Sequence, residues 1–422
     1  MIKPVILVVL GTRPEVIKLA PVIQALRGRE DMTVRVCVTA QHRQMLDRML
    51  VNFALRPDFD LDLMQQNQDL SGFTARALPR LQHVLKLIRP DFVLVQGDTT
   101  TAFVTALAAF YERVPVGHVE AGLRSFNRSN PFPEETNRVM ITRLSDLHFA
   151  PTEIASRNLV AEGIPPRTIV QTGNTVVDAL RWASGRPQRF QDPGLRSAFA
   201  ALGAGDQAVV VTTHRRENFG KPLESLCRAF LTLVAQHPRL HLFYPVHMNP
   251  KVQDNVKRLL RHPRAHLLPT LDYFDLIHLL ARSRFVLTDS GGLQEEAPSL
   301  GKPVIVLRKV TERPEAVDAG AAMLVGTKTA SVVAAATLLL TDAEFYDSMA
   351  NGHDIYGDGR ASARIVESIR HHFGLTRFKP APFRGAAAAA AERGRAACHN
   401  SSQMNSPKRH GIATGAQFIL PS

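Results

Sequence analysis

The sequence predicts an α/β protein built from two doubly wound parallel sheets. Short β-branched or aliphatic runs repeatedly lead, through a turn that contains Gly, Thr or Ser, into a helical pattern. This alternation of strand and helix is typical of parallel βαβ units. The series starts at the N-terminus and again after Gly173, and 422 residues is long for one domain. We therefore expect two Rossmann-like domains.

The first series predicts an N-terminal domain over residues 1–172. Four apolar runs have the composition of buried strands, and they cover 2–10, 33–39, 91–96 and 114–119. An amphipathic helix over 16–27 follows the first run, and a helix rich in Ala and Leu follows the third. The first run has no small-residue cleavage site after it, so we interpret it as a strand and not as a secretory signal.

A second series predicts a C-terminal domain over residues 173–355, with the division near 172–180. Its expected strands are 208–213, 240–245, 285–288 and 303–307, and a helix is expected over 223–237. Residues 376–422 are different, because they combine an Ala run with Ser, Asn, Gln and Gly and carry seven Lys or Arg against one acid, Glu392. That composition predicts a disordered basic tail without a part in the function.

Composition and charge narrow the class of partner. The tail supplies +6 of the net charge of +13, and the rest of the chain has no basic cluster interleaved with aromatic residues. A polyanionic small molecule therefore explains the charge at least as well as a nucleic acid, which we do not expect as a partner. No apolar run reaches the ~18 residues that span a bilayer, so no membrane partner is expected. Cys37, Cys227 and Cys398 lack CxxC spacing, which favours a reduced, cytoplasmic protein without a metal site.

Candidate chemistry gathers at the carboxyl ends of the expected strands, where open α/β sheets bind ligands. Acids and cations follow strand after strand there, although folding alone would favour small polar caps. The groups are Arg13, Glu15 and Lys18; Gln41, His42 and Arg43; Asp98; Glu120 and Arg124; His214 to Glu217; His247; Ser290 to Gly292 with Glu295 and Glu296; and Arg308 with Arg313.

The segment Ser290-Gly291-Gly292 is the most informative of these groups. Glycines let a backbone approach an oxygen-rich ligand closely, and the N–H groups that open a helix favour a diphosphate. Glu295 and Glu296 could simply stabilise the start of that helix, or one of them could accept hydrogen bonds from ribose hydroxyls. The first strand–helix turn is not GxGxxG and no P-loop motif occurs, so we expect no dinucleotide or other cofactor.

Several neighbouring groups have an ordinary structural alternative. Arg13 is suited to a phosphate, because its guanidinium offers bidentate donors, yet it could equally be a surface residue at a helix start. Glu134 follows Pro133 as a normal first turn would. The hydroxyls of Thr99 to Thr101 are interpreted as helix caps.

Taken together, these segments resemble one family closely, the non-hydrolysing UDP-N-acetylglucosamine 2-epimerases. The similarity runs in order from residue 1 to about 375. It is carried by the following segments: GTRPEVIKLAPVI at 11–23, TAQHRQMLD at 39–47, QGDTTTAF at 96–103, GHVEAGLRS at 117–125, PFPEETNR at 131–138, TGNTVVDAL at 172–180, HRRENFG at 214–220, YPVHMNP at 244–250, LTDSGGLQEEAPSLGKPV at 287–304, RKVTERPEAV at 308–317 and YGDGRAS at 356–362.

The resemblance implies a GT-B-like fold with the active site in the cleft between two Rossmann-like domains. It also implies a last helix within 356–375 that crosses back to the N-terminal domain, a homodimer, and roles for particular positions. The implied catalytic residues are Asp98, Glu120, Glu134 and His214. The implied substrate-binding residues are Arg13, Lys18, Ser290, Gly291, Gly292, Glu296 and Arg313. Gln41, Gln44, Arg215 and His247 match positions that contact a second, activating UDP-GlcNAc in some members.

The family's reaction converts UDP-GlcNAc reversibly into UDP-ManNAc, which supplies ManNAc units for bacterial surface polysaccharide. UDP is eliminated to give 2-acetamidoglucal and then adds back, which needs a base for the C2 proton and groups that stabilise the departing diphosphate. Asp98, Glu120 and Glu134 are the candidate acids and bases, with their individual roles open. Near Leu271–Leu276 the residue that covers uracil is also open. A GT-B glycosyltransferase, a hydrolysing 2-epimerase and a non-catalytic nucleotide-sugar sensor are the alternatives.

Overall fold

The computed structural model describes residues 3–40, 43–65, 69–186, 189–246, 250–311, 313–350 and 354–385. Its first half is a seven-stranded sheet of order β3-β2-β1-β4-β5-β6-β7, in which every neighbouring pair is parallel. The strands are β1 (Val5–Leu10), β2 (Thr33–Val38), β3 (Phe59–Asp60), β4 (Phe92–Gln96), β5 (Val116–Val119), β6 (Leu147–Ala150) and β7 (Ile169–Gln171).

The second half is a six-stranded parallel sheet of order β10-β9-β8-β11-β12-β13. Its strands are β8 (Gln207–Thr212), β9 (Leu240–Pro245), β10 (Ala265–Leu268), β11 (Val286–Thr288), β12 (Val304–Val306) and β13 (Ala322–Leu324). In both sheets the strand order reverses direction next to the first strand, which is the doubly wound arrangement that the sequence predicts.

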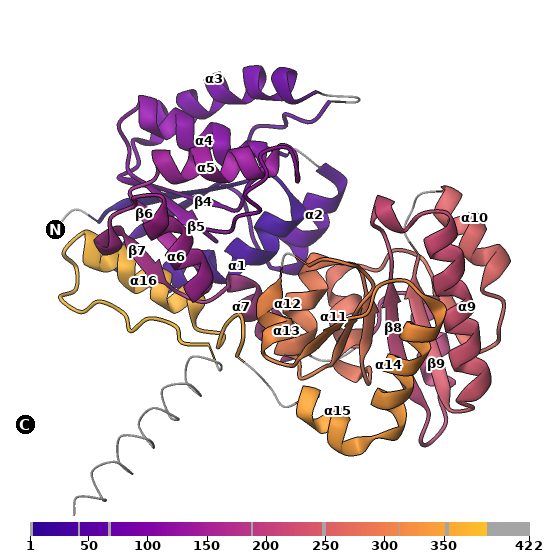
Figure 1. Cartoon of the computed structure of the whole chain (residues 1–422). Helices are drawn as coiled ribbons and strands as arrows, with labels where there is room; N and C mark the ends of the chain where they lie inside the picture. The colour runs from indigo at the N-terminus through magenta and orange to yellow at the C-terminus, as the bar shows by residue number, and fades with distance from the viewer. Residues whose placement is uncertain are drawn as a thin grey trace, which may run out of the picture.

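Helices cover both faces of each sheet (Figure 1). Those of the first half are α1 (Arg13–Arg27), α2 (Arg43–Asn52), α3 (Leu70–Ile88), α4 (Thr100–Tyr111), α5 (Glu134–Leu144) and α6 (Glu153–Ala161). Those that follow are α7 (Thr175–Ser184), α8 (Pro193–Ala200), α9 (Lys221–Gln236), α10 (Pro250–Leu259), α11 (Tyr273–Arg282), α12 (Gly291–Ser299), α13 (Pro314–Asp318), α14 (Thr329–Thr341), α15 (Ala343–Ala350) and α16 (Ala361–His372).

The alternation of side chains along β1 explains why both of its faces are covered. Val8 and Leu10 enter the core beneath α1, whereas Leu7 and Val9 enter the core beneath α3 and α4. Since successive side chains on a strand point to opposite faces, a strand that is apolar throughout must be buried on both. The sequence run that was interpreted as a strand is thus a central strand of the sheet.

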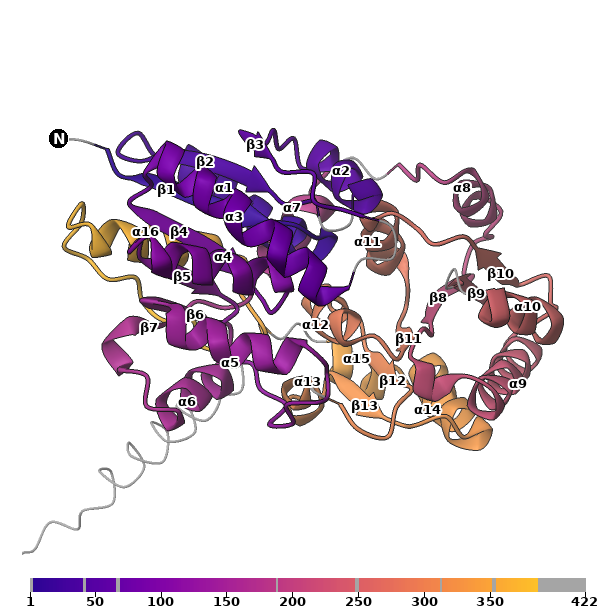
Figure 2. The ribbon, with the colours of Figure 1, turned by 90° about the horizontal axis from the view of Figure 1, so that it is seen from above.

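The two halves meet where α1, α7, α11 and α12 pack together (Figures 1 and 2). One hydrophobic core contains residues of both sheets, such as Val8 of β1 and Val210 of β8. Helix α7 lies in the middle of this core and contacts α1 on one side and α11 on the other. The sheets are therefore joined by packing around α7 and not by a bare linker.

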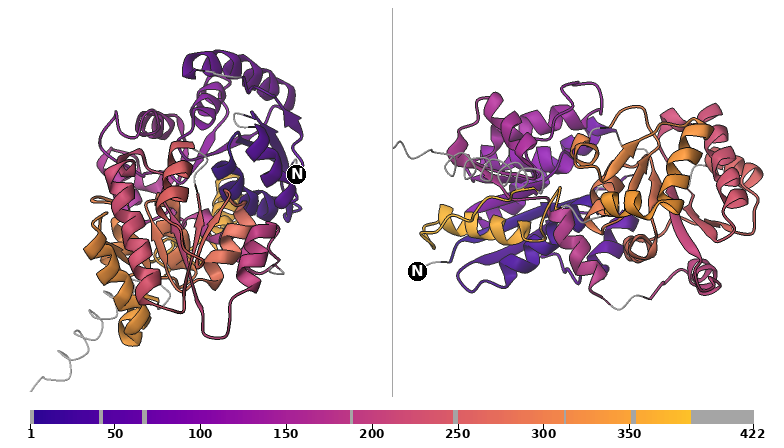
Figure 3. Two further views of the ribbon diagram at one scale, coloured as in Figure 1. Left: turned by 90° about the vertical axis from the view of Figure 1, so that its right-hand side faces the viewer. Right: turned by 60° about the horizontal axis from the view of Figure 1, so that its bottom comes forward.

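The chain returns to the first half near its end. The backbone N–H of Asn174 donates to the carbonyl of Tyr356 at 2.6 Å, so the outgoing and returning segments touch. Helix α16 then packs on α1, as the right-hand view of Figure 3 shows. An added Cβ on Gly173, whose φ is +81°, would lie 3.3 Å from Gly357 Cα, so both segments come close where each carries glycine.

Residues 376–385 continue past α16 along the edge strand β7. The N–H of Phe383 donates to the carbonyl of Gln171 at 2.8 Å, and the amide of Gln171 donates back to the carbonyl of Phe383 at 2.8 Å. The side chain of Phe383 is 2 % exposed. This differs from the expected start of the disordered tail at 376, because one buried aromatic side chain anchors the segment 376–385 against β7. Residues 386–422 lie outside the described residues.

Three further features that the sequence analysis considered are the cysteines, a metal site and a membrane-spanning segment. Cys37 and Cys227 are buried free thiols, and Cys398 is outside the described residues. Across the described ranges, no three His, Cys, Asp or Glu side chains gather as they would around a metal ion. None of the helices in these ranges has the length and apolar character needed to cross a bilayer.

Candidate active site

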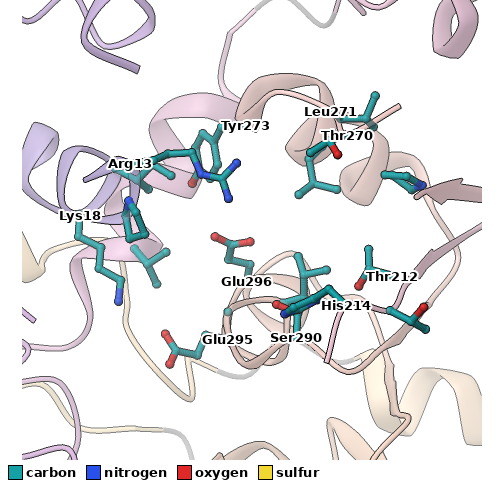
Figure 4. A pocket seen from close by; sticks show the side chains of 18 of the residues that line it. Arg13, Lys18, Thr212, His214, Thr270, Leu271, Tyr273, Ser290, Glu295 and Glu296 are labelled. Carbon is teal, nitrogen blue, oxygen red and sulfur yellow. The ribbon is translucent and has the colours of Figure 1, made fainter. Parts of the chain in front are cut away.

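A cavity of about 520 Å³ opens between the two halves at the carboxyl ends of both sheets (Figure 4). The first half contributes Arg13 and Lys18 from α1, and the second contributes residues that follow β8, β9, β11 and β12. The lining includes eight residues of the candidate groups predicted from the sequence, which are Arg13, Lys18, His214, Ser290, Gly292, Glu295, Glu296 and Arg313. Groups that are up to 300 positions apart in the sequence thus face one another across a single cavity.

The segment Ser290-Gly291-Gly292 forms the start of α12, with Ser290 as the residue before the first turn. A Cβ added to Gly291 or Gly292 would meet no atom closer than 3.6 Å among the described residues. Packing within the protein therefore does not require glycine at either position. The open space in front of the helix N–H groups suits a bulky anion, as the sequence predicts for a diphosphate.

Asp289 holds in place the residues beside this candidate anion site. Its carboxylate is 0 % exposed, and it accepts hydrogen bonds from the N–H of His214 at 3.0 Å, the N–H of Arg215 at 3.1 Å and the amide of Asn218 at 2.8 Å. Burial alone would raise the pKa of Asp289, but these hydrogen bonds and the adjacent His214 ring hold it below the ordinary value. An ionised Asp289 thus orients His214, whose Nδ1 lies 3.1 Å away.

Lys18 and Glu120 form a buried ion pair at the first-half wall. Lys18 Nζ is 2.5 Å and 2.7 Å from the two carboxylate oxygens, and the amide of Gln96 donates to Glu120 at 2.5 Å. Burial raises the pKa of Glu120, but the charge and hydrogen bond of Lys18 outweigh it and keep the pKa below the ordinary value. The φ of Glu120 is +66°, a conformation that a residue with a Cβ adopts only when its surroundings demand it.

A second carboxylate, Glu295, faces Glu120 from the other half. Glu295 is paired with Arg313, and the side-chain amide of Asn174 donates to both carboxylates, at 3.0 Å each. Asn174 is not among the site residues predicted from the sequence, and Glu295 is predicted only as an acid at a helix start or a ribose ligand. A signal for Asn174 was present, because TGNT directly follows the strand that became β7.

Glu296 lies one residue further along α12 and projects into the cavity beside Arg13 and Tyr273 (Figure 4). Burial, and then the neighbouring Glu295, raise the pKa of Glu296 to about 7. Adjacent acids on one helix therefore have opposite environments: Glu295 is paired with a cation, whereas the proton affinity of Glu296 is increased.

Asp98 and Glu134 are not among the residues that line the cavity. Asp98 pairs with Arg138 of α5 at 2.5 Å, and its carbonyl accepts a hydrogen bond from Asn137 at 2.9 Å. Glu134 is the first residue of α5, and its enclosed Oε2 has no hydrogen-bond partner among the described residues. These two carboxylates belong to the turn after β4 and to the start of α5.

The segment proposed to cover uracil separates into two sets. Leu271, Tyr273 and Leu276 line the cavity. Phe274 instead packs away from it, with its ring centroid 5.6 Å from Phe53 and 5.8 Å from Trp182. Phe274 is therefore no longer a candidate to cover the uracil base. Leu271, Tyr273 and Leu276 remain and form an apolar wall of the cavity.

The structure also shows what Thr99, a predicted helix cap, and Glu15, a candidate site residue, contact. The hydroxyl of Thr99 accepts a hydrogen bond from the N–H of Ala102, so its predicted role as the cap of α4 is confirmed. Glu15 is fully buried and accepts from the N–H groups of Gly11 and Thr12 and from the Thr99 hydroxyl, at 2.9, 2.7 and 2.6 Å. Glu15 therefore links the turn after β1 to the turn after β4, and its hydrogen bonds stabilise the fold.

The positions implied for a second nucleotide-sugar are only partly described. Gln41 and His247 lie outside the described residues, and Gln44 belongs to α2 without a described side chain. Arg215 is adjacent to the anion site, since its Nη2 would lie 3.6 Å from a Cβ on Gly291. These four positions stay a prediction.

Two parallel Rossmann-like sheets that face each other across a ligand cavity define a protein of the GT-B-like class. Within that class, the family model for UDP-N-acetylglucosamine 2-epimerase matches residues 24–370. The chain belongs to the UDP-N-acetylglucosamine 2-epimerase family, as the motif resemblance predicts.

Individual relatives agree with this assignment. The chain is 50% identical over 372 residues to a putative UDP-N-acetylglucosamine 2-epimerase of Thermotoga maritima, with 88% of this chain and 97% of the relative covered. It is 46% identical over 372 residues to the UDP-N-acetylglucosamine 2-epimerase of Escherichia coli K12, with 87% and 98% covered.

Solved structures give the same picture of the fold. The UDP-GlcNAc 2-epimerase of Neisseria meningitidis bound to UDP-GlcNAc superposes with a TM-score of 0.80 at 44% identity, with 87% of this chain and 100% of that chain covered. A putative UDP-N-acetylglucosamine 2-epimerase of Listeria monocytogenes superposes with a TM-score of 0.83 at 41% identity, with 91% and 100% covered.

Proposed function

We propose that this protein is a non-hydrolysing UDP-GlcNAc 2-epimerase that interconverts UDP-GlcNAc and UDP-ManNAc. The observation that carries the proposal is the meeting of two chemically different walls in one cavity. The second-half wall offers a helix start suited to a diphosphate, and the first-half wall offers Arg13, Lys18 and the buried Glu120 behind it. Binding of UDP-GlcNAc by the Neisseria relative supports this choice of substrate.

The reaction must break a C2–H bond that no adjacent carbonyl acidifies. In the proposed first step a carboxylate takes the C2 proton, the C1–O bond to UDP breaks, and a C1=C2 double bond forms. In the second step a proton is delivered to the opposite face of C2, and a diphosphate oxygen bonds to C1 again. No oxidant or reductant is consumed.

Two faces of the sugar need two proton-transfer groups, and Asp98, Glu120 and Glu134 are the proposed set. Glu120 is held ionised by Lys18, so it begins as a proton acceptor or as a fixed negative charge. Asp98 and Glu134 occupy neighbouring turns of the same half. General acid–base catalysis by such groups typically contributes about 10²–10⁴-fold in rate.

Departure of UDP places negative charge on the diphosphate at the start of α12. Arg13 and His214 line the cavity beside Ser290 and Gly292, and we assign them to stabilise that charge. His214 is oriented by Asp289, so its ring does not have to be reorganised during the step. Arg313 and Glu296 complete the proposed nucleotide site.

Three further expectations belong to this proposal. We propose a cytoplasmic homodimer that supplies ManNAc units for bacterial surface polysaccharide. We also propose that a second UDP-GlcNAc activates the enzyme through Gln41, Gln44, Arg215 and His247. Sedimentation with and without UDP-GlcNAc tests the dimer, and a sigmoidal dependence of rate on UDP-GlcNAc tests the activation.

Incubation with UDP-GlcNAc in D₂O, followed by NMR, decides among the alternatives. Epimerisation predicts a mixture of UDP-GlcNAc and UDP-ManNAc with deuterium at C2. A hydrolysing enzyme would release UDP and free N-acetylmannosamine, and a glycosyltransferase would leave the C2 proton unexchanged. Unchanged substrate without exchange, from protein that still binds UDP, would refute the proposal and favour a nucleotide-sugar sensor.

A further inference from the structure

The side chain of Asn174 occupies the point where the two halves of the active site meet. It is 3 % exposed and stands at the start of α7, directly after β7. Its Oδ1 accepts a hydrogen bond from the N–H of Val176 at 3.0 Å. An oxygen that accepts from a backbone N–H sets the orientation of the whole amide, so Nδ2 must point the other way.

Both hydrogens of that Nδ2 group are used, each by a different carboxylate. One is donated to Glu120 Oε1 and the other to Glu295 Oε2, at 3.0 Å in each case. Glu120 follows the last residue of β5 in the first sheet, and Glu295 lies on α12 of the second half. A single amide thus links acids that come from opposite sides of the cleft.

The surrounding charges make this link sensitive to its geometry. Glu120 is faced by Lys18 from α1, by Arg313 from the segment before α13 and by Glu295 from α12, and His118 lies two residues before it on β5. Gln96 from β4 adds an uncharged donor. Lys18 and Arg313 each neutralise one acid, and Asn174 separates the two acids that would otherwise repel each other.

The backbone of the same residue contacts the returning chain. Asn174 donates its N–H to the carbonyl of Tyr356 at 2.6 Å, beside the close approach of Gly173 and Gly357. Asn174 is therefore fixed by both crossings of the chain between the halves, while its side chain holds one acid from each half.

We propose that Asn174 is a positioning residue that holds Glu120 and Glu295 in register across the cleft. The proposal rests on the proposed epimerase function and adds to it a residue that is not among those lining the cavity. It makes the alignment of the proton-transfer wall with the nucleotide wall depend on one amide. Loss of its two donors is expected to impair the chemical step more than the binding of UDP.

Two variants separate this role from helix capping. Asn174→Asp keeps the shape and the cap acceptor, loses both donors and adds a negative charge beside two carboxylates. Asn174→Ser also keeps a capping hydroxyl but adds no charge. Asn, Asp and Ser cap helices about equally well, so neither change should unfold α7. Asp69→Asn, at the start of α3 where Asp69 accepts from the N–H of Gly72, is the matched control for exchange at a cap.

The expected kinetic result is a fall in kcat of about 10²-fold for both variants, with KM and the Kd for UDP within about 3-fold. Both variants should move the acidic limb of the kcat–pH profile upward, because the hydrogen bond from Asn174 helps to lower the pKa of Glu120. The shift should be larger in Asn174→Asp, about one unit, because an added like charge also favours the protonated form of Glu120. Wild-type kcat in both variants, or a loss that simply follows a lower Tm, would overturn the proposal.

Urea unfolding tests the contact between Asn174 and Glu120 without depending on catalytic activity. In Asn174→Asp the added charge raises the folded pKa of Glu120, so the urea midpoint should fall further below wild type as pH rises from 4.5 to 7. This pH-dependent difference should shrink in a Glu120→Gln background and be smaller in Asn174→Ser, which loses the hydrogen bond to Glu120 but adds no charge. An unchanged difference in that background would show that Asn174 does not act on Glu120. Wild-type protein that binds UDP but gives no C2 exchange would refute the proposed function, while this comparison would still decide the contact.

Discussion

Lys18 Nζ lies within 2.7 Å of both carboxylate oxygens of Glu120, so one buried cation neutralises one buried acid through two contacts. The pair joins the middle of α1 to the end of β5. The Glu120 side chain is 6 % exposed and that of Lys18 is 18 % exposed, so water reaches the pair only in part and each charge is stabilised chiefly by the other.

Lys18→Met is therefore expected to destabilise the protein by about 3 kcal/mol at pH 7, since it leaves Glu120 buried without its cation. The folded pKa of Glu120, now below its ordinary value, should rise above it in the variant. Urea unfolding should show a penalty that shrinks as pH falls from 7 to 4.5, where Glu120 can take up a proton. The double variant Lys18→Met/Glu120→Gln should recover most of the loss at pH 7, and failure to recover would show that packing of the lysine stem dominates.

Asp98→Asn should abolish exchange at C2 and leave the affinity for UDP within about 3-fold of wild type. Asp98 lies outside the cavity lining and pairs with Arg138, so it has no part in the nucleotide site. Loss of a proton-transfer group typically costs about 10²–10⁴-fold in rate. NMR in D₂O measures the exchange and calorimetry measures the binding. A large loss of UDP binding would instead make Asp98 a residue that holds the ligand.

Glu296 gives the folded protein a specific pH dependence. Its folded pKa of about 7 is above the ordinary value of 4.5, so between these pH values the folded state binds a proton that the unfolded state has lost. Stability from this group is therefore lost as pH rises through that window. Glu296→Gln should stabilise the protein by about 2 kcal/mol at pH 8 and have little effect at pH 5. The exposed Glu344→Gln is the control, and equal shifts in both variants would contradict the assignment.

Leu276→Ala should weaken UDP binding by about 5-fold, because the apolar wall loses three carbons at roughly 0.8 kcal/mol for each fully buried carbon, and Leu276 is only partly buried. Leu276→Phe should keep or improve the affinity, since an aromatic face can stack on a base. Phe274→Leu is the matched control from the same helix, because Phe274 packs on Phe53 and Trp182. That change should lower Tm without changing the Kd for UDP. Unaltered affinity in Leu276→Ala would place the base elsewhere.

Phe383→Ala should destabilise the protein by about 3 kcal/mol, the cost of removing a buried aromatic ring. Thermal unfolding measures this effect, with the 83 % exposed Phe378→Ala as the control. If both changes are neutral, the segment 376–385 does not contribute to the stability of the folded state.

The sequence was sufficient for eight of the thirteen described strands, for the change of sheet after Gly173 and for part of the cavity lining. Apolar runs and glycine turns are local signals, and the carboxyl-end rule then brings Arg13, His214 and Ser290 together without coordinates. Which side chains form ion pairs, in contrast, cannot be inferred from a local sequence pattern. Which of two adjacent acids meets Arg313 depends on the rotation of α12, so Glu295 and Glu296 could not be told apart by position alone.

The roles of two other residues, Asn174 and Phe383, could not be predicted from the sequence. Asn174 has the sequence signature of an ordinary helix cap, and its second role appears only when Glu120 and Glu295 converge from separate sheets. Phe383 is one of two phenylalanines in its segment, and only its place against β7 shows that it is buried whereas Phe378 is exposed. In both cases the missing information was a long-range contact.

The close approach of Gly173 and Gly357 limits which side chains this chain can carry at the two positions. A methyl group on Gly357 would come within 3.2 Å of Val177 and the Asn174 carbonyl, and one on Gly173 would press on Gly357 and Phe383. Either addition would force the neighbouring atoms to move by a few tenths of an ångström. Two positions without side chains thus allow the outgoing and returning segments to pass close together beside Asn174, where the two halves of the candidate site meet.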